Sequence, residues 1–208
     1  MLVQSPSVIL KTDFRNWKIS GNLQLCEIIA EDNFKVREFL IKKSAESEIE
    51  CTGGCTALLI PLYGLMEING KTISANETLT LKNTENKILT IKNILEEDSD
   101  ILMIEIKEKQ EPFCENHSEI SILRNALSRI SGNTEAPNYI GIFDGREELQ
   151  YQLENPDNKI FAMVLNGAFE IQNRLLENRD AVVLWEINEL EFEALSENAL
   201  IIFFEIQK

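Results

Sequence analysis

Histidine is almost absent from this chain, whose 208 residues include only His117. Imidazole is the commonest side chain that binds transition metals, and it is the usual base of a nucleophilic triad. A single histidine therefore argues against a histidine-rich metal centre and against a Ser-His-Asp triad. Cysteine is scarce too, and the four present are too few for a disulfide scaffold in a chain of this length. The composition predicts reduced thiols and a cytoplasmic location.

Basic residues are outnumbered: 20 Lys and Arg stand against 35 Asp and Glu, which gives a net charge of −15. The longest basic run is Lys42-Lys43, so neither nucleic acid nor an anionic membrane is expected as a partner. The longest apolar run, residues 199–204, has the length of a strand and not of a membrane helix. Thr52-Gly53-Gly54 lacks the Lys-Ser/Thr of a phosphate-binding loop. The partner classes left are another protein or a small molecule.

Short apolar segments recur through the chain and predict many β-strands, among them residues 23–29, 34–41 and 101–106. The dipeptide Asn69-Gly70 separates two of these segments, and it supplies the positive φ angles that a two-residue hairpin turn requires. Strands this short and this numerous are typical of a β-sandwich or barrel.

The pattern occurs twice. Gly64-Leu-Met-Glu-Ile returns 103 residues later as Gly167-Ala-Phe-Glu-Ile, and at the same offset Glu77 matches Asp180. Near the end of each half, Ile104-Glu105-Ile106 matches Phe204-Glu205-Ile206. Matches in this order and spacing indicate a duplication. They predict one domain over residues 1–108 and a second over 135–208.

Residues 109–134 form the expected linker. Four apolar residues in it fall on one helical stripe, namely Ile120, Leu123, Leu127 and Ile130. Ser118 is suited to cap such a helix and Gly132 to end it. The sequence therefore predicts one short linker helix.

The Gly-x-x-Glu-Ile hairpin, the acidic residue ten to thirteen positions later and the closing strand resemble the second conserved block of a cupin barrel. Two such barrels in tandem resemble the pirin family and the related quercetin-dioxygenase-like bicupins. The second half carries the closer match, over residues 164–171, 180–186 and 199–206, and residues 23–32 resemble the first strand of the family. The resemblance implies an all-β fold of two cupin (jelly-roll-like) domains.

In pirins the N-terminal barrel holds a metal, usually iron, through three histidines and a glutamate. Counted back from Gly64 and onward from Glu77, those four positions fall here near Glu50, Thr52, Thr56 and Leu89. None of the three positions expected to hold histidine, Glu50, Thr52 and Leu89, does so. Thr56 stands where the family's glutamate is expected. Iron chemistry with oxygen needs imidazole and carboxylate ligands around an open position. We therefore expect no metal, no cofactor and no catalytic residue, and the family's dioxygenase activity is not carried over.

Several alternatives stay open. Cys51 and Cys55 could join Cys114 and His117 in a zinc site, or form a redox disulfide with each other. Glu50, Thr52 and Thr56 could line a polar pocket, or larger side chains such as Leu89 could fill the barrel.

The leading functional interpretation is a metal-free pirin-like bicupin that acts as a non-catalytic binding or regulatory protein. The first alternative is a cupin enzyme, dioxygenase-like or acid–base, that uses an atypical N-terminal pocket. The second is a purely structural partner in a protein complex.

Overall fold

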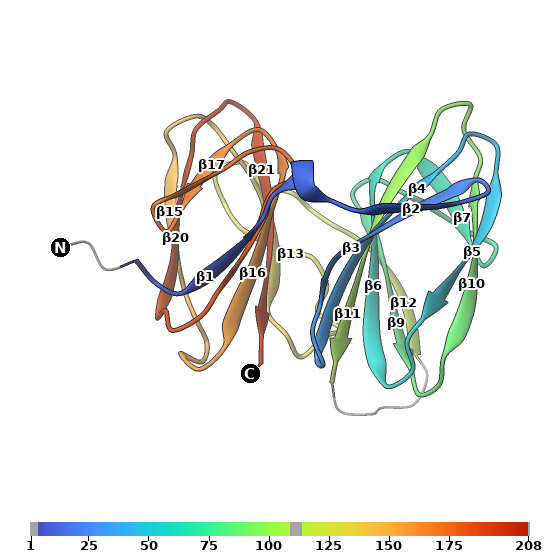
Figure 1. Cartoon of the computed structure of the whole chain (residues 1–208), viewed down its shortest axis with the longest axis horizontal. Coiled ribbons are helices and arrows are strands. Elements are labelled where there is room, and N and C mark those ends of the chain that lie inside the picture. Colours follow the sequence, from blue (N-terminus) through green and yellow to red (C-terminus); the bar gives the residue numbers. More distant parts are fainter. Residues whose placement is uncertain (1–3, 109–113, 208) are drawn as a thin grey trace. The chain divides into compact units, whose positions relative to one another are not determined.

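The computed structural model describes residues 4–108 and 114–207. These residues form 21 β-strands and one short 3-10 turn, Thr12–Phe14 (Figure 1). The predicted all-β fold class is confirmed. None of the described residues belongs to a helix that could cross a membrane.

The described chain divides into two compact units. The N-terminal unit consists of residues 15–108, 114–120 and 131–135. The C-terminal unit consists of residues 4–14, 121–130 and 136–207.

In the N-terminal unit one sheet has the strand order β12-β9-β6-β11-β4-β3-β2 and a smaller one has the order β5-β10-β7-β8. The strands are β2 Trp17–Ser20, β3 Leu23–Ala30, β4 Phe34–Ile41, β5 Glu46–Cys51, β6 Cys55–Tyr63, β7 Leu65–Ile68, β8 Lys71–Ser74, β9 Glu77–Asn83, β10 Lys87–Asn93, β11 Ser99–Lys107 and β12 Cys114–Glu119.

In the C-terminal unit the large sheet has the order β1-β19-β16-β21-β14-β13 and the small one has the order β15-β20-β17-β18. The strands are β1 Ser7–Leu10, β13 Ser128–Arg129, β14 Asn138–Phe143, β15 Glu148–Gln152, β16 Lys159–Asn166, β17 Phe169–Ile171, β18 Arg174–Leu176, β19 Ala181–Leu184, β20 Glu189–Ala194 and β21 Ala199–Ile206.

The two units repeat the same topology. The order β9-β6-β11-β4 of the first large sheet matches β19-β16-β21-β14 of the second, and the small sheets match strand for strand. Each unit encloses one apolar core between its two sheets. The duplication seen in the sequence is therefore a duplication of the whole two-sheet domain.

The domain boundaries differ from the predicted 1–108, 109–134 and 135–208. Strand β1, at the start of the chain, pairs with β19 in the C-terminal unit. Arg174 supports this placement by donating to the Ser5 carbonyl, and the Trp185 N–H donates to the Pro6 carbonyl. The first strand thus supplies an edge of the second barrel, which a reading along the sequence could not show.

The predicted linker helix is wrong for the described residues of that segment. Strand β12 pairs with β9 and β13 pairs with β14. The N–H groups of Ile120 and Ile130 donate to the carbonyls of Asn76 and Asn138. A short isolated helix is only marginally stable in water, so neighbouring strands that offer open hydrogen-bonding groups outcompete it.

The two hairpin glycines of the repeat are required by their surroundings. Gly64 has φ +104° and Gly167 has φ +77°, a region that other residues enter only with strain. A Cβ atom on Gly64 would lie 2.4 Å from the Ser99 Oγ, and one on Gly167 would lie 2.3 Å from the Ser196 Oγ. Close packing and backbone conformation therefore both exclude a side chain at these positions.

Replacing Gly167 by alanine is expected to lower the free energy of unfolding by about 2 kcal/mol, because strain and a clash add. Gly132→Ala is the matched control, since its Cβ would meet no atom within 4 Å. That control should change stability by less than about 0.5 kcal/mol. Urea unfolding of both variants measures the difference, and equal effects would contradict the account.

The acidic pair of the repeat, Glu77 and Asp180, performs the same task in each unit. Glu77 accepts hydrogen bonds from the N–H and hydroxyl of Ser74, three residues earlier. Asp180 accepts from the N–H of Glu177, at the same spacing. Each carboxylate also reaches the neighbouring edge strand or its continuation: Glu77 lies 3.2 Å from the His117 Nε2, and Asp180 binds Lys11. The repeated acid thus anchors the edge of each large sheet.

Replacing Asp180 by asparagine is expected to destabilise the C-terminal unit by about 2 kcal/mol at neutral pH. Burial opposes ionisation of Asp180, but the hydrogen bonds from Lys11 and the Thr12 N–H outweigh it and lower the pKa. A lowered folded-state pKa gives stability that is present above the unfolded pKa, about 3.9, and is lost as pH falls through the folded value. Urea unfolding between pH 7 and pH 3 should show the two proteins converging in acid. A pH-independent difference would contradict this role.

Candidate functional site

The structure does not bring the four predicted positions together as one ligand set. Glu50 is exposed, and its carboxylate accepts from the Asn86 side chain. Thr56 is buried but donates its hydroxyl to Glu108. Leu89 is 1% exposed and belongs to the apolar core. Of the four, Thr52 and the backbone of Glu50 lie beside a charged cluster inside the barrel.

That cluster follows from the alternation of side chains along β4 and β11. Phe39 and Met103 pack in the core, so every second residue toward one end of each strand also faces inward. These positions are Lys35 and Arg37 on β4 and Glu105 on β11. The register pairs Lys35 with Glu105 and Arg37 with Met103. The apolar core is thus followed by charged residues at one end of the barrel. This end, marked by Lys35, Arg37 and Glu105, is here termed the N-terminal mouth.

Glu105 is the centre of the N-terminal mouth and is only 2% exposed. Its Oε2 accepts from the Arg37 Nη2 at 2.7 Å, and the Lys35 Nζ lies 3.7 Å away. Its Oε1 accepts from the Thr52 N–H at 2.6 Å. The Arg37 Nη2 also donates to the Glu50 carbonyl. A buried carboxylate with two cations and a backbone donor is a satisfied ion pair rather than an open carboxylate.

The thiols beside this cluster are poor nucleophiles. Burial, reinforced by Glu105, raises the pKa of Cys51 to about 12. Burial also raises the pKa of Cys55, against the opposing charges of Lys35 and Lys107. Because the thiolate is the reactive form, both cysteines are held as thiols at neutral pH.

The structure does not support the alternative of a zinc site. Cys114 is exposed on β12, and His117 on the same strand contacts Glu77. No three His, Cys, Asp or Glu side chains among the described residues are grouped so that they could hold a metal ion. All four cysteines are free thiols in the structure.

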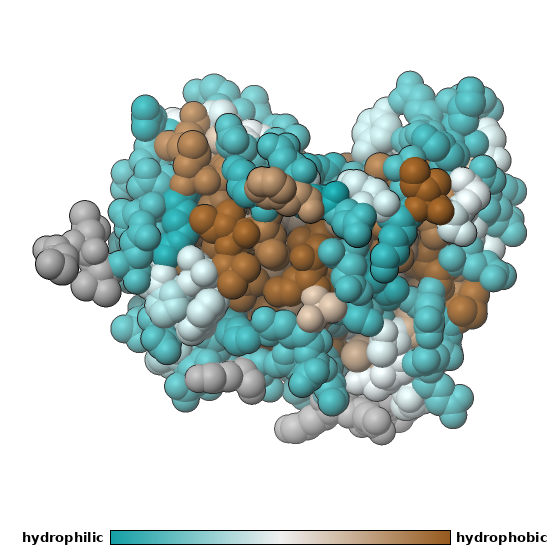
Figure 2. All heavy atoms as spheres, in the orientation of Figure 1, coloured by the Kyte–Doolittle hydropathy of each residue, from teal (hydrophilic) through white to brown (hydrophobic). Residues whose placement is uncertain are grey.

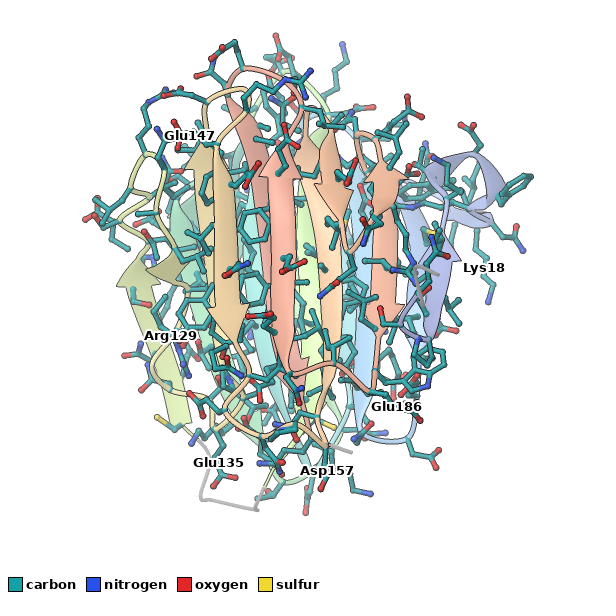
Figure 3. All side chains as sticks on the ribbon, turned by 90° about the vertical axis from the view of Figure 1, so that its left-hand side faces the viewer. Lys18, Arg129, Glu135, Glu147, Asp157 and Glu186 are labelled. Carbon is teal, nitrogen blue, oxygen red and sulfur yellow. The ribbon has the colours of Figure 1, made fainter. Side chains whose placement is uncertain are left out.

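The C-terminal unit has a matching buried acid, Glu205, whose side chain accepts hydrogen bonds from neutral donors. Glu205 is fully buried, and its Oε2 accepts from the Tyr151 hydroxyl at 2.8 Å and from the Glu154 N–H. Its Oε1 accepts from the Asn155 N–H and from the Asn158 Nδ2 at 2.6 Å. The turn that it holds lies at the end of the unit where Figure 3 labels Asp157, opposite Glu147. Burial, with Glu205 reinforcing it, raises the pKa of Tyr151, so the phenol stays protonated.

A shallow depression of about 220 Å³ lies on the outer face of the small sheet of the C-terminal unit. Its ionisable lining residues are all glutamates: Glu148, Glu170, Glu191 and Glu193. In the view of Figure 2, hydrophilic residues cover most of the outside of both units. The depression is therefore lined by acidic and not by basic side chains.

Comparison with known proteins locates the chain among the cupins. Residues 130–206 match the family model described as the quercetinase C-terminal cupin domain. The crystal structure of YhhW from Escherichia coli superposes with a TM-score of 0.84 at 13% identity, covering 97% of each chain. The chain therefore shares the two-barrel fold of these proteins, and its C-terminal unit resembles the quercetinase C-terminal cupin domain. The predicted resemblance to this group is thereby confirmed.

Two further structures share this fold. A structure of the bacterial pirin YhhW from Escherichia coli in complex with nickel(II) matches with a TM-score of 0.80 at 12% identity, over 97% of this chain and 99% of that one. A quercetin 2,3-dioxygenase from Acinetobacter baumannii matches at 0.74 and 10% identity, over 98% and 79%. No curated protein sequence shows a significant match. Identities this low establish the fold of the bicupin and not its activity.

Sequence reasoning missed the central residues of the N-terminal mouth. The repeated motif drew attention to Glu105 and Glu205 as markers of the duplication, but not as buried anchors. A charged residue flanked by apolar ones in both halves was the available signal. Lys35 and Arg37 alternate with apolar residues in β4, and nothing local distinguishes inward-facing cations from solvent-facing ones.

Proposed function

We propose that this bicupin is a metal-free, non-catalytic binding protein that acts in the cytosol through a small-molecule or protein partner. One observation carries the proposal: the interior of the N-terminal mouth is occupied by the Arg37–Glu105 pair. The family's metal is replaced, on this view, by a guanidinium whose charge Glu105 balances.

The donor chemistry of the four predicted positions supports this interpretation. Leu89 offers no donor atom, and the Glu50 carboxylate faces away from the core on β5. The Thr56 hydroxyl already donates to Glu108. Iron and nickel sites are built from imidazole, thiolate or carboxylate ligands, and the residues present do not fit such a metal. No reaction step is therefore derived through one.

The alternative of an acid–base enzyme is less well supported. Its candidate carboxylate would be Glu105, the buried acid of the N-terminal mouth. A general base must reach the proton that it abstracts. Glu105 is 2% exposed and its oxygens are bound by Arg37 and the Thr52 N–H, so it is already engaged.

Adding equimolar Fe²⁺ or Ni²⁺ under anaerobic conditions and following thermal unfolding tests the proposal. A metal that binds only the folded state raises the melting temperature. We expect no rise, and, once oxygen is admitted in a separate assay, no consumption of quercetin. Escherichia coli YhhW, whose structure contains nickel(II), is the positive control. A rise with equimolar metal together with quercetin turnover would contradict the proposal.

A further inference from the structure

The cations of the N-terminal mouth exceed what the fold requires, as the duplication shows. In both units a buried glutamate on the equivalent strand, β11 or β21, accepts from a backbone N–H, that of Thr52 for Glu105 and that of Glu154 for Glu205. Glu205 completes its bonding with neutral donors. In the register, Tyr139 stands opposite Phe203 as Arg37 stands opposite Met103. The C-terminal unit thus stabilises its buried glutamate with uncharged donors.

Three cations and two carboxylates, Glu105 and Glu108, lie at the N-terminal mouth, and the Glu108 charge, like that of Lys107, acts on the Cys55 thiol. Lys35 and Arg37 lie on β4, and Lys107 follows Glu105 on the inward side of β11. Lys107 pairs in register with Cys55 and opposes the raised pKa of that thiol, which places its charge nearby. The mouth thus carries a local positive excess in a protein of net charge −15.

Lys35 retains hydrogen-bonding capacity toward solvent. Its ammonium contacts the Thr52 Oγ1 at 3.3 Å and lies 3.7 Å from Glu105, which Arg37 already binds at 2.7 Å. The Lys35 side chain is 30% exposed, whereas that of Arg37 is 12% exposed. An ammonium carries three donors, so Lys35 can bind a ligand without breaking the Arg37–Glu105 pair.

Two buried polar atoms beside this cluster have no hydrogen-bond partner among the described residues. One is the Nε of Arg37, and the other is the Oδ1 of Asn83, a residue only 4% exposed. Asn83 pairs in register with Cys55 and donates to the Cys51 Sγ. Unpaired buried polar atoms are costly: the Arg37 Nε can donate to an anion, whereas the Asn83 Oδ1 needs a donor such as water.

We propose that the N-terminal mouth binds a small oxyanion, carboxylate or phosphate, through Lys35 and Lys107 above the Arg37–Glu105 pair. This inference rests on the proposed metal-free function and names its ligand class. Charge-assisted hydrogen bonds from ammonium groups to oxyanions are strong, and a local excess of positive charge attracts anions.

Isothermal titration of the full chain with inorganic phosphate and, separately, with malonate tests the proposal at low ionic strength, where screening is weak. We expect one saturable site for at least one of the two anions. The double variant Lys35→Gln/Lys107→Gln should bind it at least about tenfold more weakly. Lys18→Gln/Lys43→Gln, which removes two exposed lysines elsewhere, is the charge-matched control and should bind like the wild type. Lys18 projects from β2 in Figure 3.

The absence of saturable binding for both anions would overturn the inference, and so would equal weakening in the two double variants. Circular dichroism of each variant verifies that it is folded. Metal content, measured on the same wild-type preparation, separates the two proposals. Stoichiometric metal would contradict the proposed function. A metal-free protein that binds neither anion would contradict only the proposed oxyanion site.

Discussion

Replacing Glu205 by methionine is expected to lower the free energy of unfolding of the C-terminal unit by about 4 kcal/mol. The carboxylate is fully buried and accepts four hydrogen bonds, from Tyr151, Asn158 and two backbone N–H groups. Methionine fills the space but leaves all four donors without an acceptor. Because each unit contains one tryptophan, Trp185 fluorescence in a Trp17→Phe background reports on this unit during urea unfolding.

Glu205→Gln is the matched control for this prediction. The amide keeps one acceptor oxygen and nearly the same shape, so the loss should be about half as large, roughly 2 kcal/mol. The N-terminal unit, followed through Trp17 in a Trp185→Phe background, should unfold as in the wild type. A methionine variant as stable as the glutamine variant would show that the four hydrogen bonds do not anchor the turn.

Replacing Arg37 by methionine is expected to cost the N-terminal unit about 3 kcal/mol. The change leaves Glu105, 2% exposed, without its close cation, and Lys35 lies farther away at 3.7 Å. Removing one partner of a buried ion pair is costly because the remaining charge stays desolvated. Urea unfolding followed through Trp17 measures the effect.

The double variant Arg37→Met/Glu105→Gln tests the cause of that loss. It removes the charge of Glu105 while keeping an acceptor for the Thr52 N–H. The double variant should be more stable than Arg37→Met alone, since no unpaired charge remains. If the stability lost in the double variant equals the sum of the losses in Arg37→Met and in Glu105→Gln, the two residues are not coupled. The ion-pair account of the mouth would then be wrong.

The sequence predicted the all-β duplicated fold because that fold depends on local signals. Asn69-Gly70 specifies a hairpin, and Gly64 and Gly167 occupy positions where positive φ and close packing exclude side chains. The recurrence of such signals at a fixed spacing is visible without a structure. The pairing of β1 with β19 is not, because it joins segments far apart in the chain and leaves no local pattern.

The candidate site was only partly predictable for the same reason. Counting from Gly64 and Glu77 indicated where the resemblance places the family's ligand residues, and Thr52 does lie beside the charged cluster. The inward orientation of Arg37 and Glu105 depends on the register between β4 and β11, which a single strand does not specify. The prediction of a linker helix was wrong because a short set of apolar residues at helical spacing also fits strand edges and buried loops.

The central proposal is that the protein is metal-free and that the Arg37–Glu105 ion pair occupies the interior of the N-terminal mouth. Elemental analysis tests it most directly, on untagged protein purified from cells grown with added iron, nickel and zinc. The account predicts far less than one equivalent of any transition metal per chain. Iron or nickel near one equivalent per chain, retained through purification, would contradict it.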